Sequence, residues 1–146
     1  PIQPLRPLRR EPLRIDGLTV ACVNAGRRWP LRRERLVLVH GSGCSADSWR
    51  YQVDGLSREY EVIAPDLPGR GGSDPAGESS IEGYAATVRR VIQRSGRRRV
   101  FLAGHSMGGA VAIQVALAYP ELLRGLILVE IGEQTRELQS RTLISY

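Results

Sequence analysis

Residues 99–113 read Arg99-Val100-Phe101-Leu102-Ala103-Gly104-His105-Ser106-Met107-Gly108-Gly109-Ala110-Val111-Ala112-Ile113, an apolar run followed by a glycine-flanked serine and a helix-forming segment. The pentapeptide at 104–108 fits G-x-S-x-G, in which the serine lies on a strained strand-to-helix turn that small neighbours permit. Two glycines around a serine are equally typical of an ordinary connection. The apolar run at 100–103 and the helical pattern at 110–118 favour the strained turn. The Ser106 hydroxyl would then be exposed beside the free N–H groups of a helix.

The composition is that of a single compact domain. The chain has 146 residues, of which 42% are hydrophobic, enough to build one core. It contains no run of about 18 apolar residues and no apolar centre of a secretory signal near its start, so we expect a cytoplasmic protein with no membrane contact. Cys22 and Cys44 and the two histidines have no metal-ligand spacing, which predicts free thiols and no metal site.

The charge pattern argues against a nucleic-acid partner. Every basic residue is an arginine, and the net charge is +6. The arginines at 27, 28, 32, 33 and 35 fall in a predicted connector rather than along one helix face, and only 5% of residues are aromatic, leaving few rings to stack on bases. The absence of lysine also excludes a P-loop.

Before the serine motif, the chain alternates between strand and helix patterns. Residues 1–12 are rich in proline and arginine and predict an irregular arm. Asp16-Gly17 lies between two apolar runs at 13–15 and 18–23, which predicts a hairpin. The aliphatic run at 36–39 is typical of a strand buried on both faces. It leads into the turn His40-Gly41-Ser42-Gly43 and a helix capped by Ser45 or Asp47.

The remaining segments continue this alternation. We predict a strand at 60–64, a loop of turn formers at 65–74, a helix from a capping box at 79–82 to Gly96, and a strand at 125–129 that ends at Glu130. Alternating strands and helices predict an α/β fold, a mostly parallel sheet with helices on both faces. Ligands bind at the carboxyl ends of such strands, where the turn at 40–43, Ser106 and Glu130 all lie.

These motifs resemble, in their order, the α/β-hydrolase fold family. The resemblance covers residues 13–132 and rests on the hairpin, the turn at 40–43, the loop Asp66-Leu67-Pro68-Gly69-Arg70-Gly71-Gly72-Ser73, the motif Gly104-His105-Ser106-Met107-Gly108-Gly109 and the strand 125–130. It implies the first six strands of that core, without the cap and the last strands. Residues 133–146 would begin the cap or a helical segment.

The resemblance also implies a function and a site. Ser106 would be the nucleophile of a serine hydrolase that cleaves a small ester or related acyl compound through an acyl-enzyme, without a cofactor. Thioesterases and carbon–carbon bond hydrolases share the motif, whereas epoxide hydrolases carry aspartate in place of the serine. Met107 and Ser42 would supply the N–H groups of the oxyanion hole, with Gly43 as the alternative to Ser42. The remaining turn and pocket residues would be His40, Gly41, Gly43 and His105.

Two members of a catalytic triad are less clearly placed. In the family the base is a later histidine, which this sequence lacks, and His40 is expected to hold its turn by hydrogen bonds. Some members place the acid where Glu130 stands, although a carboxylate there also suits a cap on the next segment. Asp66 is expected to hold its own loop.

The missing parts of the pattern lead to further expectations. The chain resembles the front half of a longer protein and would be nearly inactive alone. The strand 125–129 would form an open edge, which favours self-association or docking of a C-terminal half. The alternative is a non-catalytic small-molecule-binding protein, or a subunit completed by a partner, on the same scaffold.

Overall fold

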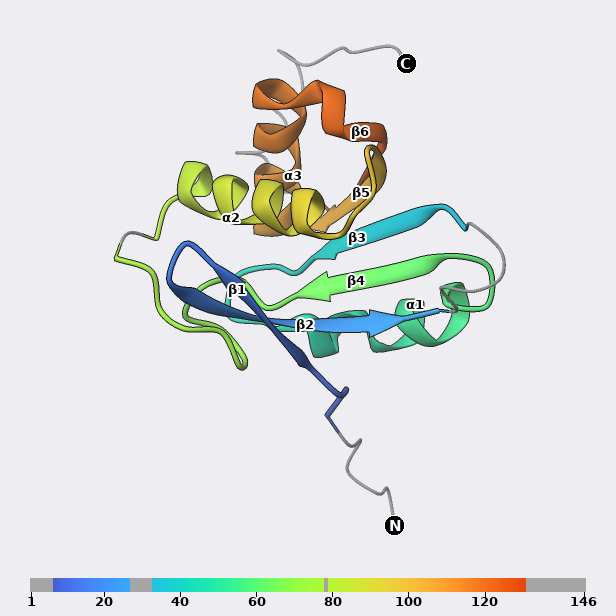
Figure 1. Cartoon of the computed structure of the whole chain (residues 1–146), viewed down its shortest axis with the longest axis horizontal. Helices are drawn as coiled ribbons and strands as arrows, with labels where there is room; N and C mark the ends of the chain where they lie inside the picture. Colours follow the sequence, from blue (N-terminus) through green and yellow to red (C-terminus); the bar gives the residue numbers. More distant parts are fainter. Residues whose placement is uncertain (1–6, 27–32, 78, 131–146) are drawn as a thin grey trace.

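A single six-stranded sheet organises the computed structural model, which describes residues 7–26, 33–77 and 79–130. The strands lie in the order β1-β2-β4-β3-β5-β6 (Figure 1). Their bounds are β1 Glu11–Ile15, β2 Leu18–Ala25, β3 Arg35–Val39, β4 Glu61–Pro65, β5 Val100–His105 and β6 Leu123–Val129. Strands β4, β3, β5 and β6 are parallel, whereas β2 is antiparallel to both β1 and β4. The predicted mostly parallel α/β sheet is confirmed.

Helices cover both faces of the sheet, as predicted. Helices α2 (Ile81–Arg94) and α3 (Met107–Ala118) pack together on one face, and the 3-10 helix η1 (Ala46–Trp49) leads into α1 (Arg50–Leu56) on the other (Figure 1). A short 3-10 helix, η2 (Pro120–Leu122), precedes β6. Each face has its own apolar core, one built with α2 and α3 and the other around Trp49 and Val53. Two cores on one sheet are the expected result of helices on both faces.

Local turn chemistry explains why the hairpin and the helix starts were predictable. Asp16 (φ 48°) and Gly17 (φ 83°) form the two-residue turn between β1 and β2, because two positive φ angles match the twist of the strands. The Ser45 hydroxyl accepts a hydrogen bond from the Asp47 N–H at the start of η1. The predicted capping box at 79–82 has Ser79 as its first residue. In the structure Ser80 is the cap, because its hydroxyl accepts a hydrogen bond from the Gly83 N–H, and α2 begins one residue later, at Ile81.

Several strand boundaries differ from the predicted ones. Strand β1 begins at Glu11, inside the segment predicted as an irregular arm, and β6 begins at Leu123 rather than at residue 125. Helix α3 begins at Met107, directly after Ser106. Glycine disfavours a helix interior, but Gly108 and Gly109 are buried in the first turn of α3, where tertiary packing outweighs propensity.

Within the described residues, β6 pairs with β5 alone and forms one edge of the sheet. Its Ile127 is 46% exposed. The predictions for residues 133–146 and for the arginines at 27, 28 and 32 lie outside the described residues. Among the helices that the structure describes, none is both long enough and apolar enough to cross a membrane.

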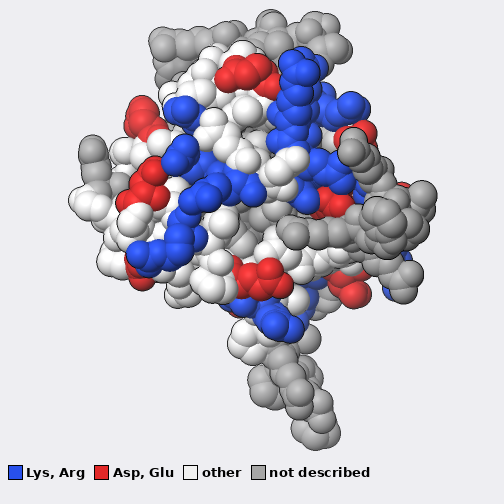
Figure 2. All heavy atoms as spheres, viewed as in Figure 1, with Lys and Arg blue, Asp and Glu red and all other residues white. Residues whose placement is uncertain are grey.

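Arginines and carboxylates lie among one another on the surface. Figure 2 shows basic side chains distributed between acidic and uncharged ones on the face that it presents. Ion pairs join Arg90 to Asp16 at 2.9 Å and Arg124 to Glu34 at 3.1 Å. Exposed pairs of this kind contribute little to stability, about 0–1 kcal/mol each.

Candidate active site

Ser106 lies at the junction of β5 and α3 in a strained backbone conformation. Its φ and ψ are 54° and −119°, a region that non-glycine residues occupy only where the surrounding structure holds them. Its N–H donates to the Val129 carbonyl at 3.1 Å, and its carbonyl accepts from the Gly109 N–H at 2.8 Å. Ser106 is thereby held between the end of β6 and the first turn of α3.

The glycines of the motif are needed because other backbone lies where side chains would be. A Cβ on Gly104 would lie 2.1 Å from the Gly108 carbonyl oxygen, and a Cβ on Gly108 would lie 2.3 Å from the Val39 carbonyl oxygen. Real Cβ atoms do not approach backbone so closely. The first turn of α3 therefore packs directly on the end of β3, which places its N–H groups beside Ser106.

The turn at 40–43 is a direct neighbour of the serine. A Cβ on Gly41 would lie 3.3 Å from the Ser106 Cβ and 3.2 Å from the His105 carbonyl oxygen. Gly43 has a φ of 70°, and the Cys44 N–H donates to the Gly41 carbonyl at 3.3 Å. Ser42 and Gly43 are exposed. The structure thus brings the predicted turn and the predicted nucleophile together at the carboxyl ends of β3 and β5.

His40 is buried, and both of its ring nitrogens bond to backbone. Its Nε2 accepts from the Leu67 N–H at 2.9 Å, so the proton is on Nδ1, which donates to the Gly41 carbonyl at 2.8 Å. Burial lowers the pKa of the ring below its ordinary value, which favours this neutral form. His40 ties the turn to the loop that begins at Asp66.

His105 pairs with Glu130, a contact that no sequence pattern predicted. The His105 Nε2 lies 3.3 Å from a Glu130 carboxylate oxygen, and the Trp49 ring meets the imidazole edge to face at 6.3 Å. The parallel register pairs His105 with Val129, so the two strands end level and Glu130 reaches across. The Glu130 side chain is 82% exposed, and its φ is 48°. The register of β5 against β6 decides this contact, so the sequence carries no local signal for it.

Asp66 is a buried carboxylate that holds several segments. It accepts from the backbone N–H groups of Ala46 at 2.8 Å and Gly72 at 3.0 Å and from the Arg10 guanidinium. Burial pushes the pKa of Asp66 upward, but these hydrogen bonds outweigh it, and the pKa lies below its ordinary value. As expected, Asp66 holds its own loop, through the hydrogen bond from the Gly72 N–H. The contact with Arg10 was not foreseen.

We expect the stability of the protein to depend on pH in the acid range. The pKa of Asp47 is also lowered, chiefly by its hydrogen bond from Arg10. Because the folded-state pKa values of Asp47 and Asp66 lie below the ordinary 3.8, their contribution is complete above about pH 5. It is lost as the pH falls through 3.8 toward the lowered values. Urea unfolding at pH 7, 5, 4, 3 and 2 measures this loss.

Asp47→Asn is the informative variant for this dependence. It removes one of the two titrating carboxylates, so the variant should be less stable than the parent at pH 7, and the two proteins should converge at pH 2. The exposed Asp54→Asn serves as the matched control. An equal difference between Asp47→Asn and its parent at pH 7 and pH 2 would contradict the assignment.

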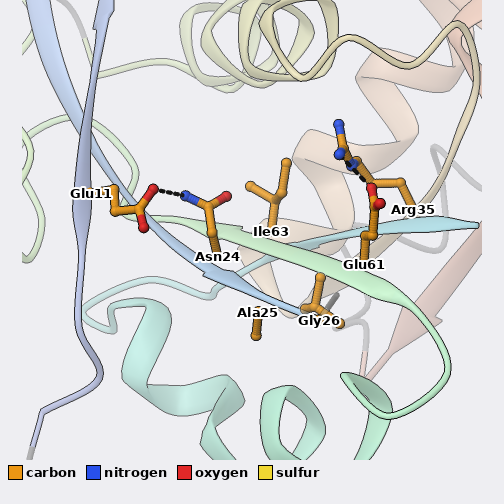
Figure 3. Close-up of a pocket in the computed structure, with 8 residues that line it drawn as sticks. Glu11, Asn24, Ala25, Gly26, Arg35, Glu61 and Ile63 are labelled. Atoms are coloured by element: carbon orange, nitrogen blue, oxygen red, sulfur yellow. Dashed lines mark hydrogen bonds and ion pairs between the residues drawn. The ribbon is translucent and has the colours of Figure 1, made fainter. Parts of the chain in front are cut away.

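A separate pocket of about 240 Å³ lies away from Ser106. Residues at the amino-terminal ends of β3 and β4 line it, and there Glu61 faces Arg35 (Figure 3). On another side of the pocket, the Asn24 amide donates to the Glu11 carboxylate at 3.2 Å. Arg35, predicted in a connector, is instead the first residue of β3 and is buried. Ligands of α/β sheets bind at the opposite, carboxyl ends of the strands, so the pocket is separate from the candidate active site.

Comparisons with known proteins match the fold. A family model described as alpha/beta hydrolase fold matches residues 34–146. The pimeloyl-[acyl-carrier protein] methyl ester esterase of Yersinia enterocolitica is 42% identical over 94 residues, which are 64% of this chain and 35% of that protein. The chain spans about a third of the length of the curated relatives that it matches.

Two solved structures are similar over most of the described fold. A bacterial membrane phospholipase A described as a virulence factor matches 86% of this chain and 40% of its own, with a TM-score of 0.78 and 32% identity. The epoxide hydrolase CorEH matches 84% of this chain and 42% of its own, with a TM-score of 0.77 and 30% identity. The similar proteins thus cleave different bonds.

Proposed function

Because the chain belongs to the alpha/beta hydrolase fold family, we propose that it supplies the nucleophile and the oxyanion-binding turn of a serine hydrolase. The bond cleaved is an ester or a related acyl bond. The observation that carries the proposal is the strained conformation of Ser106 at the β5–α3 junction, with Gly41 packed against it. Strain of this kind is concentrated at functional sites.

The proposed reaction follows from these positions. The Ser106 Oγ attacks the carbonyl carbon and gives its proton to a base. The N–H groups of Met107 and Ser42 donate to the oxyanion that forms. The tetrahedral intermediate collapses, the alcohol leaves with the proton from the base, and water then hydrolyses the acyl-enzyme. An epoxide would instead alkylate the serine to an ether that water does not cleave, so the nucleophile type favours acyl substrates.

We propose that the general base belongs to a longer protein. Both ring nitrogens of His40 are engaged with backbone, so His40 has no free nitrogen to take the serine proton. The short span relative to the relatives supports the same proposal, in which the chain is nearly inactive alone. The exposed edge of β6 is where we propose that the remaining part, or a second copy, joins.

The unpaired thiols of Cys22 and Cys44 support a cytoplasmic location.

Covalent labelling tests the proposed function. The longest protein that carries this sequence is treated with a fluorophosphonate, and the adduct is located by mass spectrometry. We expect one stoichiometric adduct on Ser106, because an activated serine attacks the phosphorus as it would a carbonyl. A second sample, in which the purified chain is mixed with the complementing segment, should regain ester cleavage. A folded protein without an adduct would instead be a non-catalytic small-molecule-binding protein.

The role of Glu130 is tested by Glu130→Gln in the same protein. We expect kcat to fall by less than about tenfold, because an exposed pair with His105 contributes about 1 kcal/mol or less. Loss of a triad acid costs about 10⁴-fold, so a fall of that size would assign the acid role to Glu130. Glu121→Gln, a change of the same kind before β6, is the matched control.

A further inference from the structure

The Arg10 guanidinium lies between two carboxylates, Asp47 and Asp66. Its Nε donates to Asp66 at 2.9 Å, its Nη2 donates to Asp47 at 3.0 Å and to Asp66 at 3.3 Å, and its Nη1 donates to Asp47 at 3.1 Å and to the Leu8 carbonyl at 2.8 Å. The side chain is 17% exposed. Only a planar fork of five donors satisfies both carboxylates at once.

The two carboxylates that contact Arg10 belong to, or bond to, the segment that carries Ser42. Asp66, which Arg10 neutralises, also accepts from the Ala46 N–H, and Asp47 follows directly. The Leu67 N–H, next to Asp66, donates to the His40 ring. The segment from His40 to Asp47 is therefore held at one end by the residue that follows Asp66 and at the other end by Asp66 itself. Between those ends lies the turn packed against Ser106.

We propose that Arg10 is a positioning residue for the oxyanion-binding turn. The inference rests on the proposed function, and it goes beyond it because Arg10 lies outside the matched residues 34–146. Without its guanidinium, Asp66 is a fully buried carboxylate that has lost its ion-pair partner, and Asp47 keeps only its 3.6 Å contact with Arg50. The two charges repel, and the backbone that both carboxylates hold moves relative to Ser106.

A displaced turn affects the transition state more than the bound substrate. Negative charge develops on the oxyanion only as the serine attacks, so a misplaced N–H group lowers kcat while KM changes little. A displacement of about 1 Å is enough for a loss of about 100-fold. General loss of folded protein, in contrast, lowers the number of active sites and leaves the rate per site unchanged.

The test compares Arg10→Met, Arg10→Lys and Arg14→Met in the longest protein that carries the sequence. Arg14 is an exposed arginine of β1 whose side chain donates to Thr19, so Arg14→Met is the matched control. Fluorophosphonate labelling of Ser106 and ester hydrolysis are measured per labelled site. We expect Arg10→Met to lower the labelling rate and kcat about 100-fold, with KM within about threefold. Arg14→Met should match the parent, and Arg10→Lys should fall between, because lysine keeps the charge without the fork.

The outcomes separate the two proposals. A parent protein without an adduct on Ser106 overturns the proposed function, and with it this inference. A labelled parent whose Arg10→Met variant reacts as fast per site overturns the positioning role alone, as does a rise in KM at unchanged kcat. If Arg10→Met does not fold, Arg10→Lys decides: parent-like kcat overturns the role, and a fall in kcat at constant KM supports it.

Discussion

Ser106→Ala is expected to lower kcat for ester hydrolysis about a million-fold in the longer protein, because alanine offers no oxygen to form the acyl-enzyme. The remaining rate comes from the oxyanion-binding N–H groups and from substrate binding, which the substitution leaves in place. Steady-state kinetics with an activated ester and a sensitive product assay measure the loss. The fluorophosphonate adduct should disappear completely.

Ser57→Ala is the matched control for this loss. The Ser57 hydroxyl donates to the Asp54 carbonyl at the end of α1, so the same chemical change occurs far from the β5–α3 junction and should leave kcat unchanged. A Ser106→Ala protein that folds and keeps more than about a hundredth of the parent kcat would rule out the covalent mechanism.

Gly108→Ala is expected to destabilise the fold by at least about 3 kcal/mol, or to prevent folding. The added Cβ would lie 2.3 Å from the Val39 carbonyl oxygen and 2.5 Å from the His40 carbonyl oxygen. Both are backbone atoms at the end of the buried strand β3, so no side chain can rotate to make room. Helix α3 would have to move away from β3, and the N–H groups beside Ser106 would move with it. Urea unfolding measures the change in unfolding free energy.

Gly55→Ala makes the same substitution where there is room. Gly55 lies in α1, and no atom lies within 4 Å of the added Cβ. We expect this variant to be more stable than the parent by about 0.5–1 kcal/mol, because alanine loses less backbone entropy in a helix. If Gly108→Ala were as stable as Gly55→Ala, the close packing of α3 on β3 would be refuted.

The parts of the fold that were predictable are those with local causes. The Asp16-Gly17 turn closes the hairpin through its own backbone angles, and the aliphatic run at 36–39 appears as the buried strand β3. Ser80 caps α2 through a bond to a residue three positions away. The bounds of the strands were less predictable, because pairing with a neighbouring strand decides where each one ends, as for β1 and β6.

The candidate site divides in the same way. The sequence predicts a site at Ser106, Met107 and the turn at 40–43 because their glycine patterns reflect backbone constraints that reside in a few consecutive residues. The pair of His105 and Glu130 depends on the register of β5 against β6, and neither residue type by itself predicts the other.

Arg10 is the clearest case of a role that the chain order conceals. It lies 37 residues before Asp47 and 56 before Asp66, in a proline- and arginine-rich segment that predicts nothing but an irregular arm. Turn residues, caps and strand patterns are readable from the amino-acid sequence because each acts on its neighbours. Which of many arginines neutralises a buried aspartate is decided only when the sheet brings distant segments together, because hydrogen bonds depend on distances of about 3 Å that the order of residues does not contain.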